Sequence, residues 1–248
     1  MKALLAALMV GTLVAPAQDA RKSGSAFMGE STRAMQSDDT QNPAMLWVAN
    51  GEAAWNAHAN RSCAACHGDA KASMRGVAAR FPAFDKEAGR VITLGQRIEQ
   101  CRVGKQGMAA FRPEADELLA LQSYIALQSR GMPLAPPQDS GTRAAAERGK
   151  ALFGQRIGQL NMSCAQCHDD NWGRKLAGAT IPQGHANACP IYRLEWQGMG
   201  SLQRRLRNCM TGVRADVPPF DAQELVDLEA WLAVRAQGMP MESPGVRP

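Results

Sequence analysis

The strings Cys63-Ala-Ala-Cys66-His67 and Cys164-Ala-Gln-Cys167-His168 decide how this chain folds. On a helix, positions i, i+3 and i+4 share one face, so the two thiols of a string can form thioethers with the two vinyl groups of one haem. The histidine that follows is then placed to ligate the iron. The strings therefore predict two covalently bound haem c groups. The attachment residues are Cys63, Cys66, Cys164 and Cys167, and the axial histidines are His67 and His168.

Other uses of these cysteines account for the pattern less well. A redox-active dithiol needs only Cys-x-x-Cys, and a zinc site normally needs two more ligands at short spacing. Seven cysteines in an exported chain would ordinarily indicate disulfides with one odd thiol. Two strings that each end in histidine, at matched positions of a repeat, favour haem attachment over two disulfide-forming pairs.

The two strings belong to an internal repeat. Each follows a helix-like stretch that begins at a glycine, Gly51 or Gly149. Further on, 94–104 matches 202–212, with leucine, arginine, cysteine and glycine in register, and 117–133 matches 224–240. The period is about 100 residues, which is the length of a domain and far longer than a solenoid repeat.

The remaining sequence is helical in pattern. Apolar residues recur at three- and four-residue steps in 117–128 and 224–236, which indicates half-buried helices, and no run alternates like a strand. We expect an all-α protein of two tandem cytochrome c-like domains related by internal duplication, with an irregular N-terminal arm. The expected parts are a signal peptide (1–17), the arm (18–48), domain 1 with haem 1 (49–133), a proline-rich linker (134–145), domain 2 with haem 2 (146–240) and a tail (241–248).

The N-terminus has the layout of an export signal. Lys2 precedes an apolar run over 3–15, and Ala15-Pro16-Ala17 is a small-x-small cleavage site. The run is short for a transmembrane anchor, so a cleaved signal and a periplasmic protein without a membrane span are predicted. The net charge of +5 is spread along the chain without a basic block, which gives no support to nucleic-acid binding.

A third cysteine occupies the same place in each copy, Cys101 and Cys209. The sixth haem ligand is often methionine or histidine, and Met108 and Met210 are nearby. Met108 has no register-matched partner, whereas the cysteines match, so we predict Cys101 and Cys209 as thiolate axial ligands, which lower the iron potential. The alternatives are buried structural cysteines or a disulfide between the halves.

Arg205 lies four residues before Cys209, so on a helix the two share a face. A guanidinium there suits an oxyanion such as thiosulfate and favours the thiolate. The sequence also has Arg204, Arg207 and Arg214 nearby, and a basic helix face exposed to solvent would explain most of these arginines.

The second half resembles the SoxA family, the larger subunit of the SoxAX cytochromes of periplasmic thiosulfate oxidation. The resemblance covers most of the mature chain and is carried by the haem string together with 178–184, Tyr192-Arg-Leu-Glu-Trp196 and Arg205-Leu-Arg-Asn-Cys209-Met-Thr-Gly212. It implies an L-cysteine S-thiosulfotransferase that pairs with a SoxX-like monohaem cytochrome c subunit as a heterodimer. The implied reaction joins thiosulfate to a cysteine of the SoxYZ carrier protein, and two electrons pass to a cytochrome c acceptor.

The resemblance also implies roles for individual residues. His168 and Cys209 would ligate the active-site iron, with Cys209 as the catalytic sulfur in the form of a persulfide. Arg205 would hold the substrate, and His67 and Cys101 would ligate the other iron. Alternative functions are a thiosulfate dehydrogenase that forms tetrathionate and a dihaem electron-transfer protein without chemistry of its own.

Some residues stay outside this pattern. Cys189 is a buried thiol or a bridge to a partner subunit. The simplest role for Trp172, Trp196 and Trp231 is packing in the core or against haem.

Overall fold

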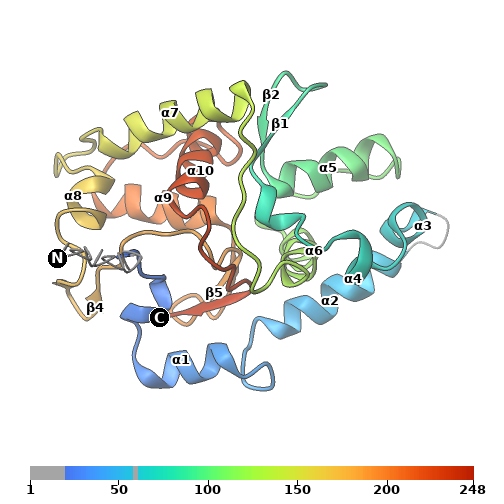
Figure 1. The fold of residues 1–248 in the computed structure, drawn as a ribbon, viewed down its shortest axis with the longest axis horizontal. Helices are drawn as coiled ribbons and strands as arrows, with labels where there is room; N and C mark the ends of the chain where they lie inside the picture. The colour runs from blue at the N-terminus through green and yellow to red at the C-terminus, as the bar shows by residue number, and fades with distance from the viewer. Residues whose placement is uncertain (1–19, 58–60) are drawn as a thin grey trace, which may run out of the picture.

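The computed structural model describes residues 20–57 and 61–248, which fold into two helical halves that lie side by side (Figure 1). The signal peptide predicted at 1–17 lies outside the described residues. The first half contains α2 (Met45–Asn56), α3 (Cys63–His67), α4 (Ala70–Ser73), the 3-10 turn η3 (Ala78–Arg80), β1 (Ala83–Asp85), β2 (Arg90–Ile92), α5 (Leu94–Gly104) and α6 (Asp116–Leu127). The second half contains α7 (Ser140–Gly154), α8 (Cys164–His168), β3 (Lys175–Leu176), β4 (Ala179–Thr180), β5 (Ile191–Arg193), β6 (Gly198–Gly200), α9 (Leu202–Gly212), α10 (Gln223–Arg235) and β7 (Gly245–Arg247).

The same helix crossing organises both halves. Helix α2 packs on α6, and α7 packs on α10, closely enough that each crossing needs a glycine. A Cβ atom added at Gly51 would overlap the carbonyl oxygen of Ala120, and one added at Gly149 would overlap that of Asp227. Only a residue without a side chain lets the two backbones approach this closely. The glycines that open the two sequence copies are therefore the contact points of the fold.

Each crossing carries its own hydrophobic core. In the first half the buried cluster includes Val48, Trp55, Leu121, Tyr124 and Ile125. In the second half it includes Phe153, Met210, Leu225, Leu228 and Leu232. Fully burying one such side chain contributes roughly 1.5–3 kcal/mol, so these clusters fix the helices that present the haem strings.

The two sequence copies also pair with each other where they end. The Gly131-Met-Pro133 and Gly238-Met-Pro240 segments run antiparallel, with a bridge between Pro133 and Pro240. The backbone N–H of Leu134 donates to the carbonyl oxygen of Met239 (2.9 Å), and that of Gly131 donates to Met241 (2.8 Å). This pairing joins the ends of the two sequence copies to each other.

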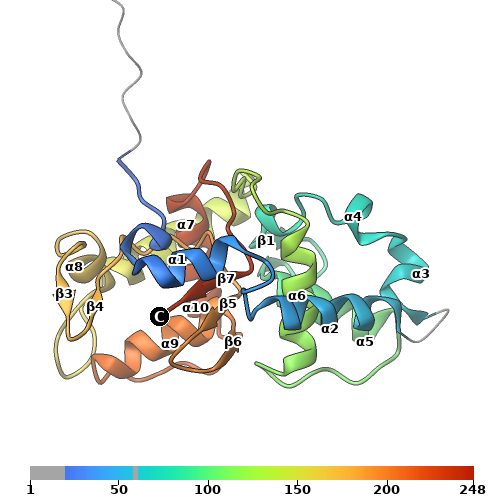
Figure 2. The same cartoon turned by 90° about the horizontal axis from the view of Figure 1, so that it is seen from below.

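The arm and the tail are more ordered than the sequence pattern suggests. The predicted irregular arm contains the 3-10 turn η1 (Gly24–Phe27) and an eight-residue helix α1 (Glu30–Ser37). Helix α1 lies against β7, which forms the edge of a three-stranded sheet in the order β6-β5-β7 (Figure 2). Gln36 accepts a hydrogen bond from the backbone of Val246 (3.0 Å), and Val246 is fully buried. Residues 241–248 are thus part of the second half.

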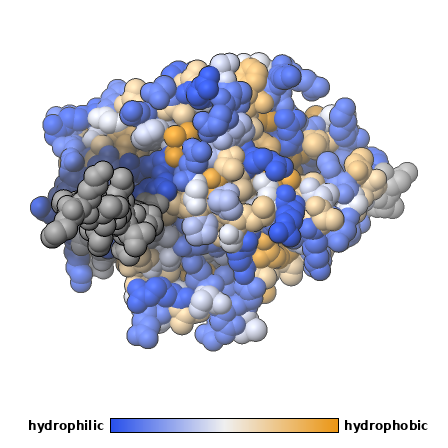
Figure 3. Space-filling model, in the orientation of Figure 1, coloured by the Kyte–Doolittle hydropathy of each residue, from blue (hydrophilic) through white to orange (hydrophobic). Residues whose placement is uncertain are grey.

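The helical architecture predicted from the sequence is confirmed, with short two- and three-stranded sheets added to it. Among residues 20–57 and 61–248, every helix is too short or too polar to traverse a lipid bilayer. The face seen in Figure 3 is mainly hydrophilic, with only scattered apolar residues.

Candidate active site

Both Cys-x-x-Cys-His strings form short helices, α3 and α8, that begin at their first cysteine. A serine caps each one. The Ser62 hydroxyl accepts a hydrogen bond from the backbone of Ala65 (2.9 Å), and the Ser163 hydroxyl accepts one from Gln166 (3.2 Å), whose side chain bonds back to Ser163. Capping fixes the helical turn, so the two thiols and the histidine of each string share one face.

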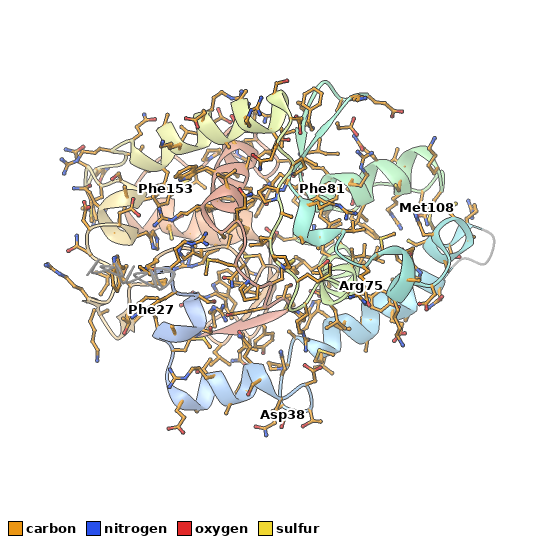
Figure 4. The ribbon with its side chains drawn as sticks, in the orientation of Figure 1. Phe27, Asp38, Arg75, Phe81, Met108 and Phe153 are labelled. Atoms are coloured by element: carbon orange, nitrogen blue, oxygen red, sulfur yellow. The ribbon has the colours of Figure 1, made fainter. Side chains whose placement is uncertain are left out.

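The imidazole of His168 is held in a defined orientation. Its Nδ1 lies 2.7 Å from the carbonyl oxygen of Pro182, which leaves Nε2 free to act as a ligand. Gly184 has φ +74°, and a Cβ atom there would come within 3.0 Å of the imidazole. Phe153, labelled in Figure 4, lies with its ring centroid 6.4 Å from that of the histidine. The loop after α8 thus fixes the ring.

Cys209 lies beside this histidine but belongs to a different helix, α9. It lies on α9, whose first turn is capped by Ser201, and its thiol is hydrogen-bonded to His168. Burial raises the pKa of Cys209, but the hydrogen bond to His168 and the charges of Arg205 and His168 outweigh burial, so the pKa lies below its usual value. The thiolate is therefore favoured at this position.

The second half has the donor set that haem c requires. Two thiols, Cys164 and Cys167, lie near Cys209. Burial raises the pKa of both thiols, and the charge of Cys209 raises it further, so that the pKa of Cys164 reaches about 11. The imidazole nitrogen of His168 that does not contact Pro182 is available as a ligand, and the Cys209 sulfur lies beside the same ring. Cys164 also packs on the apolar cluster around Phe153, which supplies the hydrophobic wall that a porphyrin needs. The residues fit a covalently attached haem c: Cys164 and Cys167 would bind it covalently, and His168 and Cys209 would supply the ligands to its iron.

The first half repeats the arrangement in a more exposed form. Cys66 and His67 are exposed, while Cys63 and Cys101 are half-buried. The Trp55 ring lies 5.8 Å from that of His67, and its Nε1 donates to the carbonyl of Gly68 (3.0 Å). Burial raises the pKa of Cys63, and the nearby Cys101 raises it further. The structure therefore brings Cys101 toward the first haem string.

The methionine alternatives are engaged elsewhere. Met210, beside Cys209 in sequence, is buried among Phe153, Leu225 and Leu228, and it is Cys209 that contacts His168. Met108, labelled in Figure 4, accepts a hydrogen bond from the Arg102 guanidinium (3.7 Å to sulfur).

Arg193 belongs to the site, although the sequence alone assigned it no role within the segment Tyr192-Arg-Leu-Glu-Trp196. It ends strand β5, its side chain is only 13% exposed, and it pairs with Glu195 at 2.8 Å. Its positive charge contributes to the lowered pKa of Cys209. Arg193 ends the first strand of the hairpin before α9, and the equivalent residue in the first half is Asp85, at the end of β1 in the hairpin before α5. The internal repeat therefore offered no matching arginine.

The tryptophans divide into three environments. Trp231 packs on Phe153 with 6.4 Å between ring centroids, as predicted for a core residue. Trp172 is not in the core, since it is 42% exposed and lies beside Phe27, and its packing against haem stays a prediction. For Trp196 the prediction of a packing role misses a contact, because the guanidinium of Arg204 lies over its ring.

Cys189 is a free thiol that lines a cavity of about 130 Å³ between the two halves. Burial raises its pKa to about 12, so it is held as a neutral thiol. Glu229 lines the same cavity, and burial raises its pKa to about 8.

Two helical halves, each with a capped Cys-x-x-Cys-His string and a third cysteine brought to it, define a c-type cytochrome with tandem cytochrome c domains. The sequence model of the SoxA/TsdA cytochrome c domain family matches residues 50–134 and 148–241. The chain belongs to the SoxA family.

Individual relatives agree with this assignment. The chain is 39% identical to the L-cysteine S-thiosulfotransferase subunit SoxA of Pseudaminobacter salicylatoxidans, over 91% of this chain and 80% of the relative. It is 35% identical to the subunit of the same name from Paracoccus pantotrophus, over 91% of this chain and 78% of that protein. The crystal structure of SoxXA from P. pantotrophus superposes with a TM-score of 0.88 at 35% identity, covering 92% of this chain and 87% of the other.

Proposed function

We propose that the protein is the catalytic subunit of a SoxAX-type complex, an L-cysteine S-thiosulfotransferase that joins thiosulfate to a cysteine of a SoxYZ carrier protein. The observation that carries this proposal is the position of Cys209, whose sulfur faces His168 and has Arg205 one helical turn away. The names of the SoxA relatives from P. salicylatoxidans and P. pantotrophus give the same activity for those proteins.

The overall reaction requires an electron acceptor. A carrier thiol loses its proton, and one S–S bond forms between its sulfur and the outer sulfur of thiosulfate. The product is a carrier S-thiosulfonate, with one proton and two electrons released. Haem c, when bound, supplies the one-electron redox chemistry that passes these electrons to a cytochrome c acceptor.

The residues of the chain divide the remaining work. In the second half, Cys164 and Cys167 would hold haem 2, and His168 and Cys209 would be its axial ligands, with Cys209 as the catalytic sulfur in the form of a persulfide. In the first half, the corresponding residues would hold haem 1 as an electron-transfer group: Cys63, Cys66, His67 and Cys101.

Arg205 would bind the substrate. Thiosulfate carries two negative charges, and a planar guanidinium can donate two parallel hydrogen bonds to its oxygens. The same charge favours the thiolate of Cys209, which is the form that acts as a nucleophile or ligand. Arg193 adds a second positive charge at the same sulfur.

The complex would include a small SoxX-like monohaem cytochrome as the second subunit of a heterodimer. The P. pantotrophus structure that superposes on this chain is of SoxXA, which supports such a partner. Export by the predicted signal peptide would place the complex in the periplasm, where carrier, thiosulfate and acceptor meet.

A cytochrome c reduction assay tests the proposal. The purified complex receives thiosulfate and ferric cytochrome c, with and without the carrier protein. Reduction that depends on the carrier, with thiosulfate appearing on the carrier cysteine by mass spectrometry, is the expected result. Reduction without carrier would instead indicate tetrathionate formation, and no reduction with carrier would leave only an electron-transfer role.

A further inference from the structure

A groove of about 320 Å³ lies along the exposed side of α9, next to the stripe that carries Arg205 and Cys209. We call it the cationic groove. Its lining residues are Trp196, Arg204, Arg207, Asn208, Thr211, Val217 and Phe220.

The two guanidinium groups of the groove are held in place before any partner arrives. That of Arg204 lies 4.2 Å from the Trp196 ring centroid and donates to the carbonyl oxygen of Met199 (3.1 Å). That of Arg207 lies 4.2 Å from the Phe220 ring centroid and donates to the carbonyl oxygen of Pro218. A guanidinium has five N–H donors, so most remain available. Fixing both side chains in advance lowers the entropy lost on binding.

The groove is strongly positive. No carboxylate lines it, and among residues 20–57 and 61–248 neither Arg204 nor Arg207 has an acidic partner. Helix α9 itself contains no Asp or Glu. A basic helix face that serves only solubility would extend its guanidinium groups into water, whereas here both are held over aromatic rings. Unpaired and ordered positive charges attract and orient an anionic partner.

The groove adjoins the site along α9, because Arg204 and Asn208 of its lining directly precede Arg205 and Cys209. The Trp196 ring contacts the guanidinium of Arg204, which lines the groove. The centroid of the same ring lies 5.3 Å from the guanidinium of Arg193. The charge of Arg193 in turn acts on Cys209. A partner seated over Trp196 is therefore next to the residues that surround the reacting sulfur.

We propose that the cationic groove docks an acidic segment of the carrier protein, so that the carrier cysteine is delivered to Cys209. This inference rests on the proposed function, because only that reaction needs a protein-borne thiol at the site. Arginine and aromatic side chains are both enriched at protein interfaces, and the groove combines the two. A thiosulfate ion would leave both rings uncovered, whereas a peptide segment covers the rings and pairs its carboxylates with Arg204 and Arg207.

The double variant Arg204→Gln, Arg207→Gln tests the docking surface in the assembled complex. The apparent KM for the carrier should rise about tenfold at low ionic strength, while the KM for thiosulfate and the haem spectrum stay unchanged. In the wild type the carrier KM should rise with added salt, and in the variant this dependence should flatten. The variant Arg204→Lys, Arg207→Lys keeps the charge and should recover most of the loss.

The matched control is Arg214→Gln, which removes an exposed arginine just after α9 and outside the groove. It should leave the carrier KM unchanged. An unchanged carrier KM in the double Gln variant, or an equal effect in the control, would overturn the docking role. A rise in the thiosulfate KM alone would identify a small-anion subsite instead. Failure of the wild-type complex to use any carrier would refute the proposed function itself, so the two failures are distinct.

Discussion

The thiol of Cys209 on α9 is hydrogen-bonded to the imidazole of His168 on α8. The other nitrogen of that ring, Nδ1, is 2.7 Å from the Pro182 carbonyl, so the histidine is oriented from behind while it presents Nε2 to the sulfur. The serine caps fix the helices α8 and α9 that carry the two residues, and the loop after α8 orients the imidazole through Pro182. We propose this pair as the centre of the thiosulfate chemistry.

Replacing Cys209 by alanine should abolish turnover without loss of haem. The covalent attachment uses Cys164 and Cys167, which the substitution leaves intact, so intact-mass spectrometry should still show every haem of the wild type. Removal of the reacting sulfur should reduce kcat by roughly two orders of magnitude or more. The Cys101→Ala variant is the matched control: it should alter the spectrum of the first haem and leave substantial activity. Full activity of the Cys209 variant would remove this residue from the mechanism.

Replacing Arg205 by alanine should weaken thiosulfate binding. Loss of charge-assisted hydrogen bonds costs roughly 1.5–3 kcal/mol, which corresponds to about a 10- to 100-fold decrease in kcat/KM for thiosulfate. The carrier KM should stay within about twofold of the wild type, because the cationic groove is intact. Arg97→Gln is the control, since Arg97 occupies the same register in the first half and is paired with Asp85. Equal thiosulfate kinetics in wild type and Arg205→Ala would exclude the binding role.

The sequence predicted the parts of this molecule that depend on local spacing. The two Cys-x-x-Cys-His strings became one-turn helices, and the apolar steps in 117–128 and 224–236 became α6 and α10. Strand β7 could not be predicted, because Val246 pairs with Tyr192, which lies more than fifty residues earlier in the sequence. The strand is also too short for its side chains to show a strand-like alternation of apolar and polar residues.

The same limit applies to the site. Arg205 was predicted because it lies one helical turn from Cys209, which is a local relationship. Arg193 reaches the same sulfur from a different element, strand β5, and its counterpart at the end of β1 is Asp85, so the internal repeat offered no matching arginine. Trp196 was expected in the core on composition alone, whereas its position under Arg204 depends on how β5 and β6 pair.

Substitution of Gly149 by alanine should destabilise the second half. The added methyl group would overlap the Asp227 carbonyl, and forcing the helices apart costs typically 1–3 kcal/mol. Gly51→Ala should have a similar effect in the first half. Gly154→Ala is the control, because it lies in the last turn of the same helix with open space around it and should be neutral or slightly stabilising. Chemical denaturation of the three variants measures these differences, and an unaltered midpoint for Gly149→Ala would mean that the crossing is not close-packed.

Glu229 should make the protein less stable as the pH rises. Burial raises its pKa to about 8, the hydrogen bond from Gln203 lowers it, and the charges of Asp221 and Glu114 raise it again. Below about pH 4.5 the carboxyl group is protonated in both the folded and the unfolded chain and contributes no pH dependence. Between about pH 4.5 and 8 the unfolded chain loses this proton while the folded protein keeps it, so the free energy of unfolding falls by on the order of 1 kcal/mol per pH unit. The Glu229→Gln variant keeps the shape of the side chain and cannot ionise. The stability advantage of this variant over the wild type should therefore grow from pH 5 to pH 8, as measured by urea denaturation at each pH. A constant difference across that range would show that Glu229 is already ionised in the folded protein.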